Sequence, residues 1–208
     1  MPRLGLAADG PRPLDLPAIF GREAPVIVDI GFGMGDATAQ IAERQPQFDF
    51  IGIEVHTPGI GALMRRIEAS GLTNIRVIEG DADVIFDRLF RPDSIAGIHL
   101  FFPDPWPKKR HHKRRLVNAQ FLTKVFPLLT TPGYVHWVTD WADYADSILV
   151  AFEHSPFGAV VPTDSLAPSV ENAYGSMIRS RPVTKFERRG QALGHPVVER
   201  VGQSKGAP

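Results

Sequence analysis

The chain of 208 residues contains no cysteine, and this absence removes several kinds of chemistry at once. Disulfides, thiolate nucleophiles and cysteine-ligated zinc all need a thiol. No apolar run approaches the roughly 20 residues that a membrane-spanning helix needs. The first 13 residues contain arginine, glycine and proline but no apolar core, so no signal peptide is expected. These absences are compatible with the location that we expect, the cytoplasm, and with a protein that has no membrane partner.

The chain also lacks a net charge, because 23 lysines and arginines balance 23 aspartates and glutamates. Within this balance, residues 108–115 hold six lysines or arginines and two histidines, with no acid among them. Like charges at such density repel one another and lower stability unless an anion binds them. Apolar residues make up 43% of the chain, which is enough for a sizeable core. The composition therefore predicts a folded protein with one concentrated anion-binding patch.

Short apolar runs alternate with helical patterns along the chain. Strands are expected over residues 26–30, 48–55, 74–79, 95–102 and 133–139, and helices over residues 36–44, 58–70, 81–90, 116–129 and 144–154. The strand runs are mainly apolar without strict alternation, as in strands that are covered on both faces. This order predicts an α/β fold with a doubly wound, mostly parallel sheet and helices on both faces.

The two ends of the chain differ in composition from its middle. Residues 1–24 are rich in glycine and proline and are expected to form a flexible arm, with a flexible tail over residues 202–208. A single domain is expected over residues 25–201. Its last part is expected to hold a short strand over 159–161, a helix over 171–179 and a final strand over 195–201.

Five acidic residues close or follow the five main strands: Asp29, Glu54, Asp81, Asp104 and Asp140. Parallel strands present their carboxyl ends at one edge of the sheet, where open α/β sheets bind ligands, so these acids are expected to line one cleft. Acids after strands also cap helices, and for Asp81 capping explains the residue as well as ligand contact does. Glu54 begins no obvious helix, which favours a ligand role there.

The first expected strand leads into a glycine turn, Gly31-Phe32-Gly33-Met34-Gly35, which is followed by Asp36. A dinucleotide-binding turn prefers a small residue in place of Asp36, and a phosphate binds best where no carboxylate adds negative charge. Asp29 and Asp36 therefore favour a cofactor with a cationic amine. Glu54 lies where an acid takes up ribose hydroxyls. S-adenosylmethionine fits these features, because it has an amine, a sulfonium and a ribose but no phosphate. We expect Asp29 near its amino acid end and Asp81 near its adenine.

The fourth expected strand runs into a turn that holds one acid, Asp104, between prolines. Pro103, Pro105 and Pro107 fix φ and lack N–H groups, which stiffens the turn. Trp106 either stacks on a base or packs in the core.

The basic residues 108–115 that follow this turn indicate a phosphate-binding surface. The alternative is a solvated helix start, but acids at helical spacing would normally dilute its charge. His111 and His112 are polar neighbours in this block, and no metal site is expected from two adjacent histidines.

Together these motifs resemble the bacterial tRNA (guanine-N7-)-methyltransferase family. The resemblance spans about residues 26–195 and rests on the segments Asp29–Gly35, Gly52–His56, Phe101–Arg115, Thr139–Trp141 and Thr184–Gly190. The proline-flanked aspartate with its basic tail is highly specific, whereas the glycine turn alone is not. Asp29 stands where many members have Glu, which keeps the charge and shortens its reach by one methylene.

The resemblance implies a class I methyltransferase domain that uses S-adenosyl-L-methionine to methylate N7 of a guanine in the variable loop of tRNA. Guanine N7 carries a free lone pair, so no general base is needed. Most of the rate enhancement is expected to come from aligning N7 with the methyl group of the cofactor. Asp104 is the implied catalytic residue, acting through hydrogen bonds to guanine or by stabilising positive charge. The target guanine must lie in a loop or leave its stack, because the deep groove of an RNA helix hides N7.

The resemblance also implies a set of contacts. Those to the cofactor are Asp29, Gly31, Gly33, Glu54, Asp81 and Asp104. Those to the target nucleotide are Lys108, Asp140, Thr184, Lys185, Phe186 and Glu187, and those to the RNA backbone are Arg110, His111, His112, Lys113, Arg114 and Arg115. From the residues alone, the segment 184–187 could equally be an ordinary strand. The implied partner is tRNA, bound by a monomer or a homodimer.

Two other classes of protein compete with this interpretation. A nicotinamide-dependent oxidoreductase would also have a glycine turn, but Asp29 and Asp36 disfavour a pyrophosphate there. An RNA-binding module with a degenerate cofactor site would explain the basic block. The intact acids at the strand ends argue against this second alternative.

Overall fold

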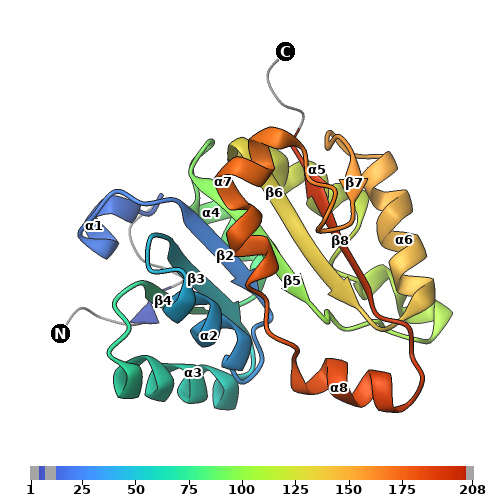
Figure 1. Cartoon of the computed structure of the whole chain (residues 1–208), viewed down its shortest axis with the longest axis horizontal. Coiled ribbons are helices and arrows are strands. Elements are labelled where there is room, and N and C mark those ends of the chain that lie inside the picture. Colours follow the sequence, from blue (N-terminus) through green and yellow to red (C-terminus); the bar gives the residue numbers. More distant parts are fainter. Residues whose placement is uncertain (1–4, 8–12, 205–208) are drawn as a thin grey trace.

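The computed structural model describes residues 5–7 and 13–204. Its centre is an eight-stranded sheet in the order β1-β4-β3-β2-β5-β6-β8-β7 (Figure 1). The strands are β1 (Gly5–Leu6), β2 (Val26–Ile30), β3 (Asp49–Glu54), β4 (Ile75–Glu79), β5 (Ile95–Phe101), β6 (Leu129–Thr139), β7 (Val160–Val161) and β8 (Val198–Gln203). β1 to β6 are parallel, β8 is antiparallel to β6, and β7 is antiparallel to β8. The predicted doubly wound, mostly parallel sheet is confirmed.

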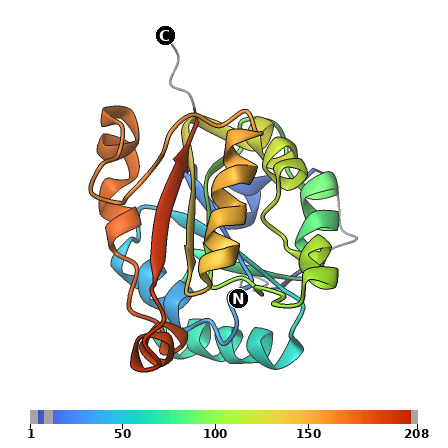
Figure 2. The same ribbon diagram turned by 90° about the vertical axis from the view of Figure 1, so that its right-hand side faces the viewer.

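Helices cover both faces of this sheet. They are α1 (Leu16–Phe20), α2 (Asp36–Arg44), α3 (Thr57–Ser70), α4 (Ala82–Leu89), α5 (Ala119–Val125), α6 (Ala142–Glu153), α7 (Pro168–Arg179) and α8 (Lys185–Ala192), with 3-10 helices η1 (Lys109–Arg114) and η2 (Phe126–Leu128). Figure 2 shows α6 and α7 on opposite sides of the sheet. No helix of the described residues is long and apolar enough to cross a membrane.

The central strands are mainly apolar because each of their faces meets a core. Ile27 and Val28 are neighbours in β2 and both are fully buried. Ile27 packs in the cluster formed with α2, α3 and α7, whereas Val28 packs in the cluster formed with α4, α5 and α6. Successive side chains of a strand point to opposite faces, so both must be apolar. Full burial of one such side chain contributes about 1.5–3 kcal/mol.

The described part of the segment predicted as a flexible arm, 5–7 and 13–24, contains two short elements, β1 and α1. Leu6 extends the sheet by pairing with β4 at Ile78. Phe20 in α1 packs against the core and lies under the guanidinium of Arg76, whose Cζ is 4.8 Å from the ring centre. Glycine and proline dominate the composition there, but a few apolar side chains are enough to dock the segment. Residues 1–4 and 8–12 lie outside the described residues.

Three other predicted boundaries also differ from the structure. The helix expected over 116–129 is shorter, because Pro127 has no N–H to continue an α-helix and lies in the tighter turn η2, which begins at Phe126. β8 continues to Gln203, so the domain extends past residue 201 into the predicted tail, of which 205–208 lie outside the described residues. The segment at 184–187 begins helix α8 rather than forming a strand.

Candidate active site

The glycine turn between β2 and α2 has a backbone that requires glycine. Gly31, Gly33 and Gly35 have φ angles of 70°, 57° and 75°, in the left-handed region that L side chains rarely adopt. A Cβ on Gly35 would lie 2.6 Å from Leu63 Cβ, and one on Gly59 would lie 2.0 Å from the carbonyl oxygen of Gly33. At Gly31 and Gly33 an added Cβ would meet nothing within 4 Å, so this side of the turn is open. Sequence reasoning missed Gly59, which lets α3 approach the turn.

Asp29 lies beside this turn, one residue before the end of β2. Its side chain is buried, with 2% of the residue exposed, and it accepts a hydrogen bond of 2.6 Å from Thr38 Oγ1. Burial raises the pKa of Asp29 to about 6, against the lowering effect of the Thr38 hydrogen bond, and the nearby Glu54 charge raises it further. A cation placed against Asp29 would favour its charged form. The group is therefore suited to an amine.

Glu54, at the end of β3, holds the glycine turn in place. Its Oε2 accepts a hydrogen bond from Gly33 N at 2.8 Å, and its Oε1 accepts from Val55 N at 2.7 Å and His56 N at 3.0 Å. A carboxylate offers about four acceptor positions, so capacity for a ligand hydroxyl remains. The structure thus gives Glu54 a structural role, while the ligand role stays a prediction.

The acids that follow β2 and β4 also have structural partners. Asp81 is the N-cap of α4, and its Oδ1 accepts from Asp83 N at 2.8 Å, so the capping explanation holds. Asp36 begins α2, and its carboxylate forms an ion pair with Arg66 of α3. The charge of Asp36 is therefore partly compensated, and Asp29 is the acid whose charge the turn leaves without a cation among the described residues.

Asp104 lies in a strained turn just beyond the carboxyl end of β5. Phe102 and Trp106, two residues to either side of it, have φ angles of 55° and 45°, which are unusual without glycine. Such a backbone conformation destabilises the fold by about 1–3 kcal/mol per residue and persists only where the surrounding structure enforces it. Strained residues of this kind are concentrated at functional sites. Asp104 itself is exposed. Its charge adds to the burial that raises the pKa of Tyr144 in α6 to about 12.

Trp106 packs against the basic block rather than in the core. The Cζ of Arg114 lies 4.9 Å from the centre of its ring, and the ring of His111 meets it edge-on at 5.8 Å. Cation–π contact of this kind contributes about 0.5–1 kcal/mol at exposed sites. Trp106 therefore orders η1 beside the Asp104 turn.

The basic block forms the exposed 3-10 helix η1, but its last residue points inward. Residues 108–110, 113 and 114 are exposed, and His111 and His112 are half-buried. Arg115 is buried, with 5% exposed, and it donates to Pro105 O, Ser147 Oγ and Asp143 Oδ2. Protein groups thus surround the guanidinium of Arg115, unlike those of the exposed cations, and its predicted contact with RNA is not tested by the structure.

Helix α8 lies below the carboxyl ends of the strands and contacts the end of β6 (Figure 1). A Cβ on Gly190 of α8 would lie 2.9 Å from Asp140 Oδ2, and His195 Nδ1 lies 3.8 Å from the same atom. The helix begins with a capping box, in which Thr184 Oγ1 accepts from Glu187 N at 3.1 Å and Glu187 Oε2 accepts from Thr184 N at 3.3 Å. The structure thus brings Asp140 close to Gly190 of α8 and to His195. Contact of Asp140 and of the segment 184–187 with the target nucleotide stays a prediction.

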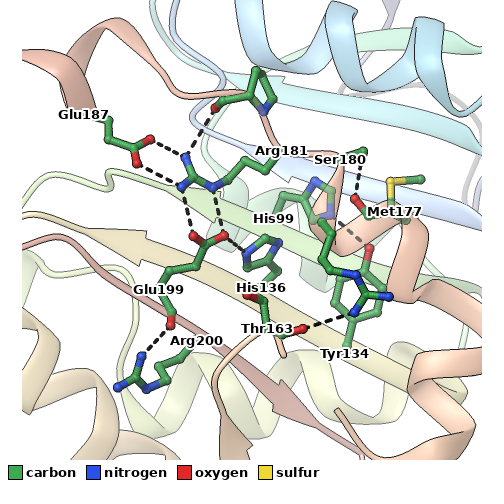
Figure 3. A network of polar contacts seen from close by, with 12 residues as sticks. His99, Tyr134, His136, Thr163, Met177, Ser180, Arg181, Glu187, Glu199 and Arg200 are labelled. Atoms are coloured by element: carbon green, nitrogen blue, oxygen red, sulfur yellow. Dashed lines mark hydrogen bonds and ion pairs between the residues drawn. The ribbon is translucent and has the colours of Figure 1, made fainter. Parts of the chain in front are cut away.

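Buried ion pairs anchor this helix to the sheet (Figure 3). Arg181 donates to Glu187 Oε2 at 2.6 Å and to Glu199 Oε1 at 2.9 Å, and His136 Nε2 is 2.7 Å from Glu199 Oε1. Glu187 is buried with both its oxygens engaged, which gives it a structural role, while its contact with the target nucleotide stays a prediction. Lys185 and Phe186 remain exposed, Phe186 by 66%.

This network keeps the Glu199 carboxylate ionised. Burial raises the pKa of Glu199, but hydrogen bonds from His136 and Arg181 outweigh it and lower the pKa to about 2. Burial also lowers the pKa of His136, so its ring is neutral and donates through Nε2. Sequence reasoning missed Arg181, Glu199 and His136, because no spacing pattern relates residues from three separate elements.

A separate hollow of about 200 Å³ lies at the opposite edge of the sheet, beside the amino ends of β2 and β3. Arg22 and Asp49 line it, and the Arg22 guanidinium pairs with Asp49 Oδ1 at 2.7 Å. The strand-end acids, the glycine turn and the basic helix all lie at the carboxyl edge instead. The chemistry of the side chains therefore places the candidate site there.

This combination of sheet order, glycine turn and strand-end acids defines a methyltransferase with a Rossmann-like fold. An antibiotic-related methyltransferase of known structure shares the fold, with a TM-score of 0.57 and 16% identity over 93% of each chain. The family model described as "Putative methyltransferase" matches residues 23–200.

The tRNA (guanine-N(7)-)-methyltransferase of Nitrosomonas europaea is 46% identical over 95% of this chain and 84% of its own. The enzyme with the same name from Paracidovorax citrulli is 48% identical over 90% of this chain and 72% of its own. The chain belongs to the tRNA (guanine-N7-)-methyltransferase family.

Proposed function

We propose that this protein transfers a methyl group from S-adenosyl-L-methionine to N7 of a guanine in the variable loop of tRNA, which forms 7-methylguanosine. The observation that carries this proposal is the position of Asp104, between the strand-end acids Asp29 and Glu54 and the basic helix η1. One edge of the sheet thus combines a site for a cationic cofactor with a surface for a polyanion. We place the reaction in the cytoplasm, with tRNA as the partner.

The cofactor site is formed by the open side of the glycine turn. Asp29 would hold the cofactor's amine, Glu54 its ribose hydroxyls and Asp81 the adenine. Gly31 and Gly33 have no side chains, so the cofactor can approach the backbone of the turn closely. S-adenosyl-L-methionine supplies a methyl group on a sulfonium, which is an excellent leaving group. The buried carboxyl of Asp29, whose pKa is about 6, fits a ligand that carries positive charge.

The protein's own residues have to align the two reactants and exclude water. Asp104 faces the place where positive charge spreads over the purine, and it either stabilises that charge or accepts hydrogen bonds from the N1–H and N2 edge of guanine. Lys108, Asp140 and the exposed start of α8, including Thr184, Lys185 and Phe186, would hold the target nucleotide. Phe186 offers a free ring face for stacking on a base that has left its own stack.

Methyl transfer into tRNA tests this proposal directly. The protein is incubated with S-adenosyl-L-methionine labelled in its methyl group and with an unmodified tRNA transcript. We expect label in the RNA, and no label in a matched transcript made with 7-deazaguanosine, in which a carbon replaces N7. Equal labelling of both transcripts would show that another atom is the acceptor.

The affinity for the cofactor should depend on pH through Asp29. The acid must be ionised to hold an amine, and its pKa without ligand is about 6. We expect the Kd for S-adenosyl-L-methionine, measured by calorimetry, to be constant between about pH 6 and the pKa of the cofactor's own amine, about 7.7–8.0, and to rise about tenfold per pH unit below pH 6. In Thr38→Val the hydrogen bond that lowers the pKa of Asp29 is lost, so the break should move to higher pH. A Kd that is unchanged down to pH 5 would contradict this role.

The exposed cations of η1 should control the salt dependence of tRNA binding. We expect the triple variant Lys109→Ala, Lys113→Ala, Arg110→Ala to weaken binding to every tRNA. The slope of log K against log salt should become less steep by about 2, because each lost phosphate contact removes about 0.7–0.9. The control is a triple variant of exposed arginines elsewhere, Arg44→Ala, Arg88→Ala, Arg91→Ala. Equal salt slopes for the two triple variants would show that the cations of η1 do not contact tRNA phosphates.

A further inference from the structure

Arg115 is the buried residue of the basic block, residues 108–115. The residue is 5% exposed, whereas the cations of η1 are open to solvent. Its Nη1 donates to Ser147 Oγ at 3.1 Å and its Nη2 to Asp143 Oδ2 at 2.5 Å, both on α6. Its Cζ also lies 4.8 Å from the centre of the Tyr144 ring. The guanidinium is thus held by one helix on several sides.

The Nε of Arg115 forms a hydrogen bond with the turn that holds Asp104. This atom donates to the carbonyl oxygen of Pro105 at 2.8 Å. Among the described residues, this is the one hydrogen bond that joins residues 103–107 to another part of the chain. Pro103, Pro105 and Pro107 have no N–H of their own to contribute. The position of the turn therefore depends on this acceptor.

The turn needs such a restraint because its backbone is strained. Phe102 and Trp106 have left-handed φ angles on either side of Asp104. Phe102 is fixed by the hydrogen bond from its N to Val138 O at 2.8 Å, which holds the entry to the turn on β6. The bond from Arg115 to Pro105 holds its far side on α6. Without the second bond, the strained residues are free to relax and to move the carboxylate.

We infer that Arg115 is a positioning residue for the methyl transfer, which aims the Asp104 carboxylate by joining the Pro105 carbonyl to Asp143 and Ser147 of α6. This inference rests on the proposed function, since it takes Asp104 as the residue at the reacting guanine. It assigns the last cation of the block to the catalytic turn instead of to RNA. Asp143, whose pKa is lowered by the Arg115 hydrogen bond, remains ionised as the anchor.

The test uses two variants that loosen the restraint from opposite ends. Arg115→Lys keeps the charge but loses the planar fork that bonds Pro105 and α6 at once. Asp143→Asn removes the anchoring charge at a side chain that is 63% exposed, so folding should tolerate it. For Arg115→Lys we expect kcat to fall about 10- to 100-fold, and for Asp143→Asn several-fold, because small misplacement of a catalytic group is costly. KM for tRNA and the salt slope of tRNA binding should stay as in the wild type.

The comparison variant is Arg114→Gln, at the neighbouring exposed cation, which should flatten the salt slope. Urea unfolding reports whether each variant is folded. If Arg115→Lys does not fold, Asp143→Asn decides. A flattened slope with unchanged kcat would place Arg115 on RNA and overturn the inference, as would wild-type kcat in both variants. A wild-type protein that labels no tRNA would instead refute the proposed function.

Discussion

Replacing Asp104 by alanine should lower kcat for tRNA methylation at least about 100-fold while leaving tRNA affinity nearly unchanged. Removal of one electrostatic stabiliser of a transition state typically costs 10²–10³ in rate. Asp104 is exposed, and among the described residues it makes no hydrogen bond or ion pair, so the fold does not depend on it. The change in stability should stay within about 0.5 kcal/mol. Single-turnover methylation and tRNA binding, measured on the same preparation, separate the two effects.

Two further variants sharpen this comparison. Asp104→Asn keeps the hydrogen-bonding shape but loses the charge, so it separates charge stabilisation from hydrogen bonding to guanine. Asp146→Ala removes an exposed acid of α6 and serves as the matched control, with wild-type activity expected. Turnover of Asp104→Ala equal to that of the control would remove Asp104 from the mechanism.

Replacing Arg181 by methionine should destabilise the protein by about 3–5 kcal/mol. The change leaves two buried or half-buried carboxylates, Glu187 and Glu199, without their cation, and breaking one side of such a network is strongly unfavourable. Without Arg181, Glu199 would take up a proton more readily, because the hydrogen bond from Arg181 lowers the pKa of this carboxyl. The loss of stability should therefore be smaller at pH 5 than at pH 8.

Arg179→Ala provides the matched control, because Arg179 pairs with Glu171 on the surface. Its side chain is 46% exposed, so the expected cost is about 0–1 kcal/mol. Urea unfolding of both variants measures the difference. Similar costs for the two changes would show that the network of Figure 3 does not hold α8 to the sheet.

The central part of the fold could be predicted because burial on two faces leaves an unmistakable apolar run. Strands β2 and β5 are such runs, and their boundaries in the structure are within a residue of those predicted. β1 and α1 were missed because they are two and five residues long and are stabilised by docking to β4 and the core. Such short elements carry too few residues for a periodic signal.

Helix α8 illustrates a signal that was present but not used. The sequence Thr184-Lys185-Phe186-Glu187 has the spacing of a capping box, which predicts a helix start rather than a strand. The helix is polar on most of its surface, so no apolar periodicity supported it. Its stability comes from the capping box and from Arg181, which precedes it in the chain.

Site residues could be predicted where the topology of the sheet fixes their location. They could not be predicted where the direction of a side chain determines its contacts. The five strand-end acids could be placed at one edge because parallel strands end together. A run of like charges does not reveal which side chain turns inward, so Arg115 was grouped with the exposed cations of η1. The only local difference is that Arg115 adjoins the apolar Leu116 and the buried Val117.

Nucleoside analysis of a tRNA transcript tests the central claim most directly. An unmodified transcript is incubated with S-adenosyl-L-methionine and either the wild-type protein or Asp104→Ala, then digested to nucleosides and analysed by mass spectrometry. We expect one 7-methylguanosine per tRNA with the wild-type protein and almost none with the variant. A different methylated nucleoside, or equal yields of 7-methylguanosine from the two proteins, would contradict it.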